Sequence, residues 1–294
     1  MNKFLSFAAL TAGLMLSVAA SAQEQATTAS SNGSYRPIPN SDIMFRKTIW
    51  RAIDLREKQN KPMFAEQREI SRVIIEAVKR GELQAYKNDS LTSTFSSKEV
   101  MSNMSYAEAS AGLSDEERAA GFSEDTGDDW GTPAPRNRNG RSAAAPRQPA
   151  APVANEYRYK DLYQMEMKED MIFDKKRSRM YHDIKAITLL VPSTLSANTS
   201  GIEKVIGTFK YSDLVKVFRN NPDKAIWFNP QNDAQHKNLA DAFELWLFNS
   251  YIVKVSNPND SRLDEIYGGQ QQGILASQQA AADLIEYEYN LWSF

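Results

Sequence analysis

A long segment rich in Pro, Ala and Arg, residues 112–156, constrains the fold more than any other feature of this chain. It begins with acidic residues and continues with prolines and arginines, so it holds little apolar surface to bury. Four arginines diluted by prolines more often form a solvated spacer than a site for nucleic acid or anionic lipid. We therefore expect two small mixed domains, 41–111 and 157–266, joined by a disordered linker.

The first 22 residues have the features of a secretory signal peptide. Lys3 precedes an apolar run from Phe4 to Ala20, and the small residues Ala20 and Ala22 predict cleavage between Ala22 and Gln23. The run is too short for a membrane anchor, and no later stretch approaches the roughly 20 apolar residues of a spanning helix. We expect an exported mature chain with no transmembrane segment.

The cysteine count and the charge balance narrow the class of protein further. Zero cysteines exclude disulfides, metal-thiolate sites, a Cys nucleophile and a lipid-modified N-terminal Cys. Because the chain has 35 basic and 37 acidic residues, its net charge is too small to attract nucleic acid over long distances. We therefore expect any partner to be recognised by local surface features. Residues 23–40, rich in Ser, Thr and Gln, read as a flexible lead-in.

The segment 41–111 reads as a helical or mixed domain. Ser41 and Asp42 are suited to cap a helix that would end near Pro62. A second helix is predicted at about 64–80, and a short strand at 82–86. The apolar stripe of the first helix is Phe45, Ile49, Ala52 and Ile53, and that of the second is Ile70, Val73, Ile74, Ala77 and Val78.

The segment 157–266 reads as an α+β domain that opens with a hairpin. Apolar and polar residues alternate around Met165 and Met167, and a second strand runs from Met180 to Val191 after a charged turn. The later elements are a helix from Ser212, a strand at 225–228, a helix at about 237–250 and a strand at 251–255. Helix, strand and Asn-Asp-Ser turn recur in 70–90 and 239–261, which leaves open either a duplication or common turn chemistry.

The C-terminal 28 residues predict a flexible hinge at 268–273 and a terminal helix over 274–294. A single helix does not persist in water without a surface for its apolar face. That surface is either its own domain or another subunit, and both alternatives stay open. The candidate partner-docking residues are Trp50, which could equally be core, and Leu284, Ile285, Leu291, Trp292 and Phe294 of the tail.

The sequence shows no arrangement that would carry catalysis. Its two histidines, His182 and His236, lack metal-ligand spacing, and neither a nucleophile elbow nor a phosphate-binding loop is present. Glu169 and Asp170 are adjacent in a predicted strand, so they should point to opposite faces. We expect no enzyme activity, no metal and no cofactor.

Three stretches carry a resemblance to a known family. They are DIMFRKTIWRAIDLREKQNKP at 42–62, KEDMIFDKKRS at 168–178 and FNPQNDAQ at 228–235. Together they resemble the gliding motility protein GldN, called PorN in non-gliding secretors, over about 41–266 apart from the linker. The likeness lies in their length and order, because none is a catalytic signature.

The resemblance implies a non-enzymatic structural subunit of the type IX secretion and gliding machinery. Such a subunit would lie in the periplasm and be held at the outer membrane by a lipoprotein partner, GldK or PorK. It would also self-associate in a ring and contact the periplasmic part of the GldM or PorM motor.

Two other classes remain as alternatives. A stand-alone periplasmic protein that binds a small ligand or glycan would need a pocket with convergent polar groups. A substrate exported by the same system would need a β-rich C-terminal sorting domain, which the predicted hinge and helical tail argue against.

Overall fold

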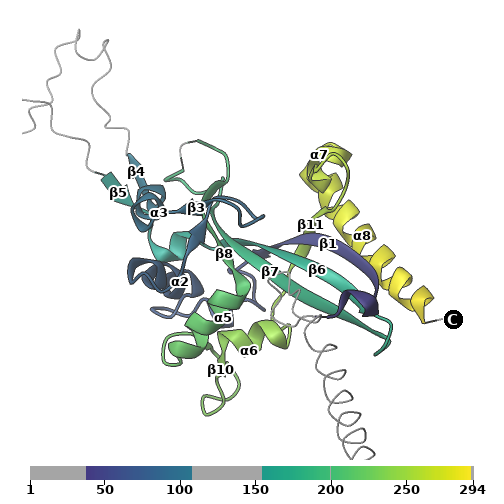
Figure 1. The fold of residues 1–294 in the computed structure, drawn as a ribbon. Helices are drawn as coiled ribbons and strands as arrows, with labels where there is room; N and C mark the ends of the chain where they lie inside the picture. The colour runs from purple at the N-terminus through teal and green to yellow at the C-terminus, as the bar shows by residue number, and fades with distance from the viewer. Residues whose placement is uncertain (1–37, 108–153, 199, 293–294) are drawn as a thin grey trace, which may run out of the picture.

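The computed structural model describes residues 38–107, 154–198 and 200–292 of the 294. The predicted signal peptide with Ala22 and Gln23, the lead-in up to residue 37, most of the linker and Phe294 therefore lie outside the described residues. The described part is α+β, as predicted, and centres on a seven-stranded sheet of order β11-β1-β6-β7-β8-β2-β3 (Figure 1). All its strand pairs are antiparallel.

The elements follow one another in mixed order along the chain. The main sheet contains β1 (Ile43–Asp54), β2 (Ala85–Tyr86), β3 (Thr94–Phe95), β6 (Gln164–Asp174), β7 (Arg179–Val191), β8 (Lys204–Lys210) and β11 (Tyr251–Val255). The α-helices are α2 (Ile70–Lys79), α3 (Ser97–Met104), α5 (Tyr211–Asn220), α6 (Leu239–Glu244), α7 (Leu263–Tyr267) and α8 (Gln270–Leu291). Two small pairs complete the fold: β4 (Ser105–Ala107) with β5 (Ala154–Glu156), and β9 (Ile226–Trp227) with β10 (Lys237–Asn238).

The segment 43–54, predicted as a helix, is the strand β1. It lies between β11 and β6 in the sheet, and Ile49, Trp50, Ala52 and Ile53 are all buried. Ile53 packs in the larger of two buried clusters and Ile49 in the smaller one, so both faces of the strand are covered. A short apolar run of this kind fits a buried strand as well as a helix stripe. The β-branched side chains at 43, 48, 49 and 53 favour the strand.

The two segments on either side of the linker share one sheet and one core, rather than packing as two separate domains. Ile53 of β1 pairs with Met165 of β6, and both belong to a core cluster that also holds Ile74 and Phe243. Residues 154–156, assigned to the linker, instead form β5. Because β5 pairs with β4, the linker leaves and re-enters the described structure at the same place.

The predicted hairpin is confirmed as β6 and β7, which pair from Gln164 and Leu190 to Asp174 and Arg179. The side chain of the fully buried Asp174 accepts hydrogen bonds from the backbone N–H groups of Lys176 (2.8 Å) and Arg177 (3.2 Å) in the turn. These bonds fix the turn, so the long hairpin is a rigid support for what packs on it.

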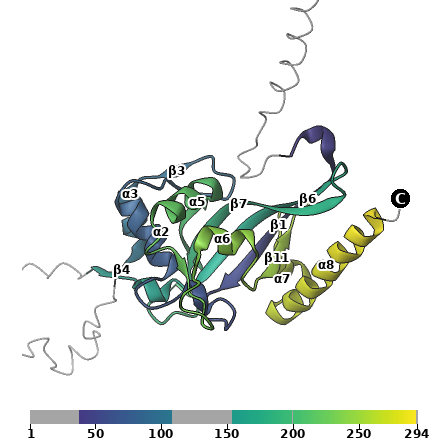
Figure 2. The same ribbon diagram turned by 90° about the horizontal axis from the view of Figure 1, so that it is seen from below.

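Helices α2, α5 and α6 gather on one side of the sheet, away from α8 (Figures 1 and 2). The predicted stripe of α2 is confirmed, because all five of its residues are buried. The predicted helix at 237–250 is shorter, since α6 ends at Glu244 and Trp246 has a left-handed backbone with φ of 57°. The final strand β11 lies where 251–255 was predicted.

The predicted hinge at 268–273 is reduced to two residues. Gly268 (φ 77°) ends α7 and Gly269 (φ 140°) precedes α8, while the chain from Gln270 onward is helical. Gly273 lets the two helices approach closely, because a Cβ there would lie 3.0 Å from Cα of Asp264. Helix α8 is therefore fixed against α7 at its start.

Candidate functional site

The C-terminal helix α8 lies along the side of the sheet formed by β11 and β1 (Figure 2). Ala276, Ala280 and Leu284 on its inner face pack against a small cluster of Ile49, Met171, Ile252 and Leu263. Further along, the ring of Tyr287 lies 4.5 Å from that of Phe45, and the ring of Trp292 lies 6.4 Å from that of Phe173. In this structure the tail therefore packs on its own chain.

One flank of α8 carries large apolar side chains that remain more than half exposed. They are Ile274, Ile285, Tyr289 and Trp292, which we call the outer stripe, with exposed fractions of 54, 68, 74 and 57%. Their intervals of 11, 4 and 3 residues place them on one side of the helix, beside the equally exposed Leu275. Exposed apolar surface of this extent is typical of an interaction site.

The charges of α8 are of one sign. It contains Asp283, Glu286 and Glu288 and no Lys or Arg. Glu288 lies in the last turn, where the helix dipole disfavours a negative charge. Among the described residues, none forms an ion pair with these three carboxylates, which accompany the outer stripe.

Of the residues predicted to dock a partner, Ile285 and Trp292 are exposed and belong to the outer stripe. Leu284 and Leu291 are half-buried, and Leu284 faces inward. Phe294 lies outside the described residues. The prediction therefore found the helix, but only part of its accessible face.

Trp50 is in the interior rather than on a docking surface. Its indole N–H donates a hydrogen bond to Asp89 (2.8 Å), and the Nζ atoms of Lys254 and Lys168 lie 4.2 and 5.0 Å from its ring. Burial works to raise the pKa of Asp89, but the Trp50 hydrogen bond and the Lys168 charge outweigh it and lower that pKa. This group stabilises the fold.

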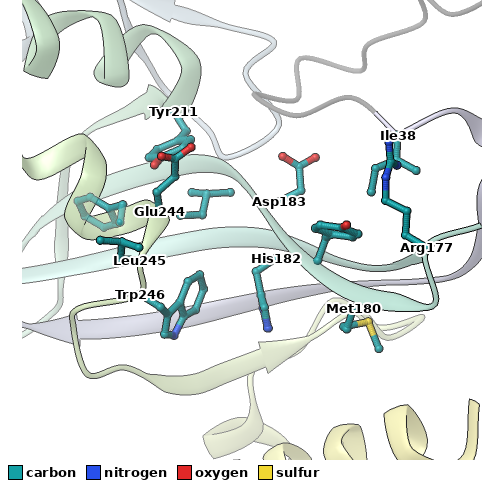
Figure 3. A pocket seen from close by; sticks show the side chains of 12 residues that line it. Ile38, Arg177, Met180, His182, Asp183, Tyr211, Glu244, Leu245 and Trp246 are labelled. Atoms are coloured by element: carbon teal, nitrogen blue, oxygen red, sulfur yellow. The ribbon is translucent and has the colours of Figure 1, made fainter. Parts of the chain in front are cut away.

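A cavity of about 470 Å³ opens between β7, the start of α5 and the end of α6 (Figure 3). Asp183 and His182 come from β7, Tyr211 from α5 and Glu244 from the last residue of α6. Arg177 and Ile38 lie together on the other side of it (Figure 3). Its size would suit a small ligand or one or two side chains of a partner.

The polar groups beneath this cavity are engaged with one another. The fully buried Glu169 accepts a hydrogen bond from Arg51 and lies 3.1 Å from Nδ1 of His182. Burial works to raise the pKa of Glu169, but the His182 hydrogen bond and the Arg51 charge outweigh it and hold that pKa below its usual range. Asp183 is likewise paired with Lys185 at 2.6 Å.

Trp246, which the sequence analysis did not single out, forms part of the cavity wall. Its ring lies 4.7 Å from His182 and 4.8 Å from Phe248, and the Arg51 guanidinium lies 5.8 Å from it. These contacts hold a bulky residue in a left-handed conformation that usually falls to Gly. No spacing in the sequence marks this position, because the strain comes from the fold.

The other groups considered for chemistry lie apart. His236 accepts a hydrogen bond from the backbone of Asn229 (3.1 Å) between β9 and β10. Asp170 accepts one from Thr48 (2.7 Å), whereas its neighbour Glu169 bonds to Arg51, so the two carboxylates serve different partners. Among the described residues, no group of three or more His, Asp or Glu side chains is placed to hold a metal ion.

These features define an α+β protein with an internally paired charge cluster and a long exposed apolar stripe. The family model of the gliding motility associated protein GldN matches residues 38–293, nearly the whole chain. The chain belongs to the GldN family, and membership makes it a component of the gliding motility and type IX secretion machinery. No curated protein matches it. Within the described ranges, no helix has both the length and the apolar character needed to cross a membrane.

Proposed function

We propose that this protein is a non-enzymatic structural subunit of that machinery which works in the periplasm at the inner face of the outer membrane. It forms a ring with a GldK- or PorK-like lipoprotein and contacts the periplasmic part of a GldM- or PorM-like motor. The family match over 38–293 carries the proposal. The absence of Cys supports it, because a chain that cannot be lipidated at an N-terminal Cys needs a partner to reach the membrane.

The shape of the sheet supports a role in transmitting force. Strands β1, β6 and β7 are long, and β6 is paired with both neighbours along its whole length. Because 41–111 and 157–266 share this sheet, the linker cannot let them move apart without breaking the pairing of β1 with β6. We therefore place the partner contacts on different surfaces of one rigid body.

The outer stripe of α8 is the surface that best fits such a contact. Ile285 and Trp292 are exposed there, and aromatic and large aliphatic side chains are the usual anchors of protein interfaces. The cavity beside Trp246 is the second candidate surface, although its charged groups are already paired within the chain.

The test is a mild-detergent purification of the protein from its native envelope, with a tag inserted in the linker so that α8 stays unmodified. We expect ring particles in the electron microscope and a co-purifying lipoprotein identified by mass spectrometry. A monomer without a protein partner would contradict the proposal and favour a periplasmic ligand- or glycan-binding protein that uses the cavity. Two variants are purified beside the wild type. Ile285→Glu changes the outer stripe, and Ile202→Glu is the matched control, because Ile202 is 71% exposed and lies outside α8.

A further inference from the structure

The outer stripe of α8 has the geometry of a helix-packing surface. Ile274 and Trp292 are 18 residues apart, so the stripe runs for about 27 Å. Ala281, one turn before Ile285, packs against the cluster beneath α8 and marks the edge of this surface. A straight surface of this length fits a partner helix of about five turns.

Carboxylates stand on both sides of the stripe. Glu286 follows Ile285 directly and Glu288 is three residues further on, so the two acids lie on opposite sides of Ile285 around the helix axis. Neither forms an ion pair with a described residue. A partner with cations beside its apolar residues would compensate both charges.

The same charges argue against two other occupants. A helix that lies on an anionic membrane surface is typically rich in Lys and Arg, and α8 has neither. A second copy of α8 would bring three more carboxylates and no cation, so pairing of two α8 helices would be repulsive.

We propose that the outer stripe binds a helix of a different protein, in which apolar residues are flanked on both sides by Lys or Arg. This inference rests on the proposed function, because it gives the chemistry of one partner contact of the same scaffold. The partner helix buries Ile285, Tyr289 and Trp292 and places its cations against Glu286 and Glu288. These cations also offset the unfavourable interaction of the Glu288 charge with the dipole at the C-terminal end of α8.

The test uses the full-length protein in its native cells, with the photo-crosslinking residue p-benzoylphenylalanine in place of Ile285. We expect crosslinks to one other envelope protein, at a helical peptide with Lys or Arg on both sides of its apolar residues. Crosslinks to a second copy, to lipid or to an acidic segment would each overturn the inference, and so would their absence.

Charge reversal provides the second arm of the test. The pair Glu286→Lys and Glu288→Lys should lower the crosslink yield at position 285 by about tenfold or more, and the Gln pair should lower it less. Asp233→Lys, at an exposed position in the loop between β9 and β10, is the matched control and should change nothing. An unchanged yield with the Lys pair would overturn the inference.

The two proposals can fail separately. If wild-type rings are purified while position 285 crosslinks to no basic helix, the scaffold function stands and the partner chemistry is wrong. If no ring or protein partner is recovered from the envelope, the scaffold function itself fails.

Discussion

The two sides of the sheet differ in how far the chain covers its own apolar surface. Beneath α2, α5 and α6 lies the large core, in which Phe218 and Phe243 are almost fully buried and stacked 6.5 Å apart. Beneath α8 the cluster holds four buried residues, while the outer stripe remains exposed. The first side can supply most of the stability of the fold. The second leaves apolar surface whose burial can drive assembly.

Truncation of a core aromatic should have the largest effect on stability. Phe243→Ala removes a side chain in contact with Phe218, Phe248 and Tyr211, so we expect a loss of about 3–5 kcal/mol in the free energy of unfolding. Ile285→Ala should stay within about 0.5 kcal/mol, because its side chain is exposed. Urea unfolding followed by circular dichroism measures both, and similar losses would abolish the contrast between the two sides.

Disruption of the buried charge cluster should have the second-largest effect on stability. Arg51→Met removes the Arg51 cation from the fully buried Glu169 and leaves only the hydrogen bond with His182, so we expect a loss of about 3 kcal/mol at neutral pH. The folded-state pKa of Glu169 lies below its ordinary value, so this stabilisation is present at neutral pH and is lost as the pH falls through that pKa. The difference in the free energy of unfolding between the wild type and the variant should therefore become smaller at acidic pH. A pH-independent difference in urea midpoints would refute the assignment.

A smaller effect is expected where α7 and α8 touch. Gly273→Leu forces a side chain into the backbone of Asp264 and should cost about 1–3 kcal/mol. Ala282→Leu places the same side chain at an exposed position of the same helix and is the matched control. Hydrogen exchange should show faster opening of α8 in the first variant alone. Equal exchange in the two variants would mean that α8 does not depend on this contact.

The smallest expected effect is a gain in stability, whereas the three changes above reduce it. Glu288→Gln removes a negative charge from the C-terminal turn of α8 and should stabilise the isolated protein by about 0.3–1 kcal/mol. Thermal unfolding at low ionic strength gives the measurement, and the gain should fade with added salt. Destabilisation by this change would show that Glu288 has a favourable partner within the fold.

The sequence correctly predicted those elements whose hydrophobic periodicity fits only one type of secondary structure. The alternation through Met165 and Met167 gave the β6–β7 hairpin, and the stripe through Ile70 and Val78 gave α2, because each pattern fits a single type of element. The prediction at 43–54 was wrong because a strand covered on both faces has no strict alternation. The pairing of β1 with β6 and β11 makes this segment a strand. The local hydrophobic pattern carries no information about such long-range pairing.

The same distinction applies to the candidate site. The apolar positions of α8 were found from spacing, but which of them face the sheet depended on Ile49, Met171 and Ile252. The left-handed Trp246 and its stacking on His182 could not be predicted, since they arise where α6 meets β7. Sequence reasoning thus identified the helix that carries the exposed surface, and the fold decided which face that is.

The most direct test of the central claim is purification of the Ile285→Glu protein from the native envelope beside the wild type and Ile202→Glu. We expect that all three have the same unfolding temperature, and that Ile285→Glu alone loses a protein partner. Retention of every partner by Ile285→Glu, at wild-type amounts, would contradict the claim that the exposed flank of α8 is a docking surface.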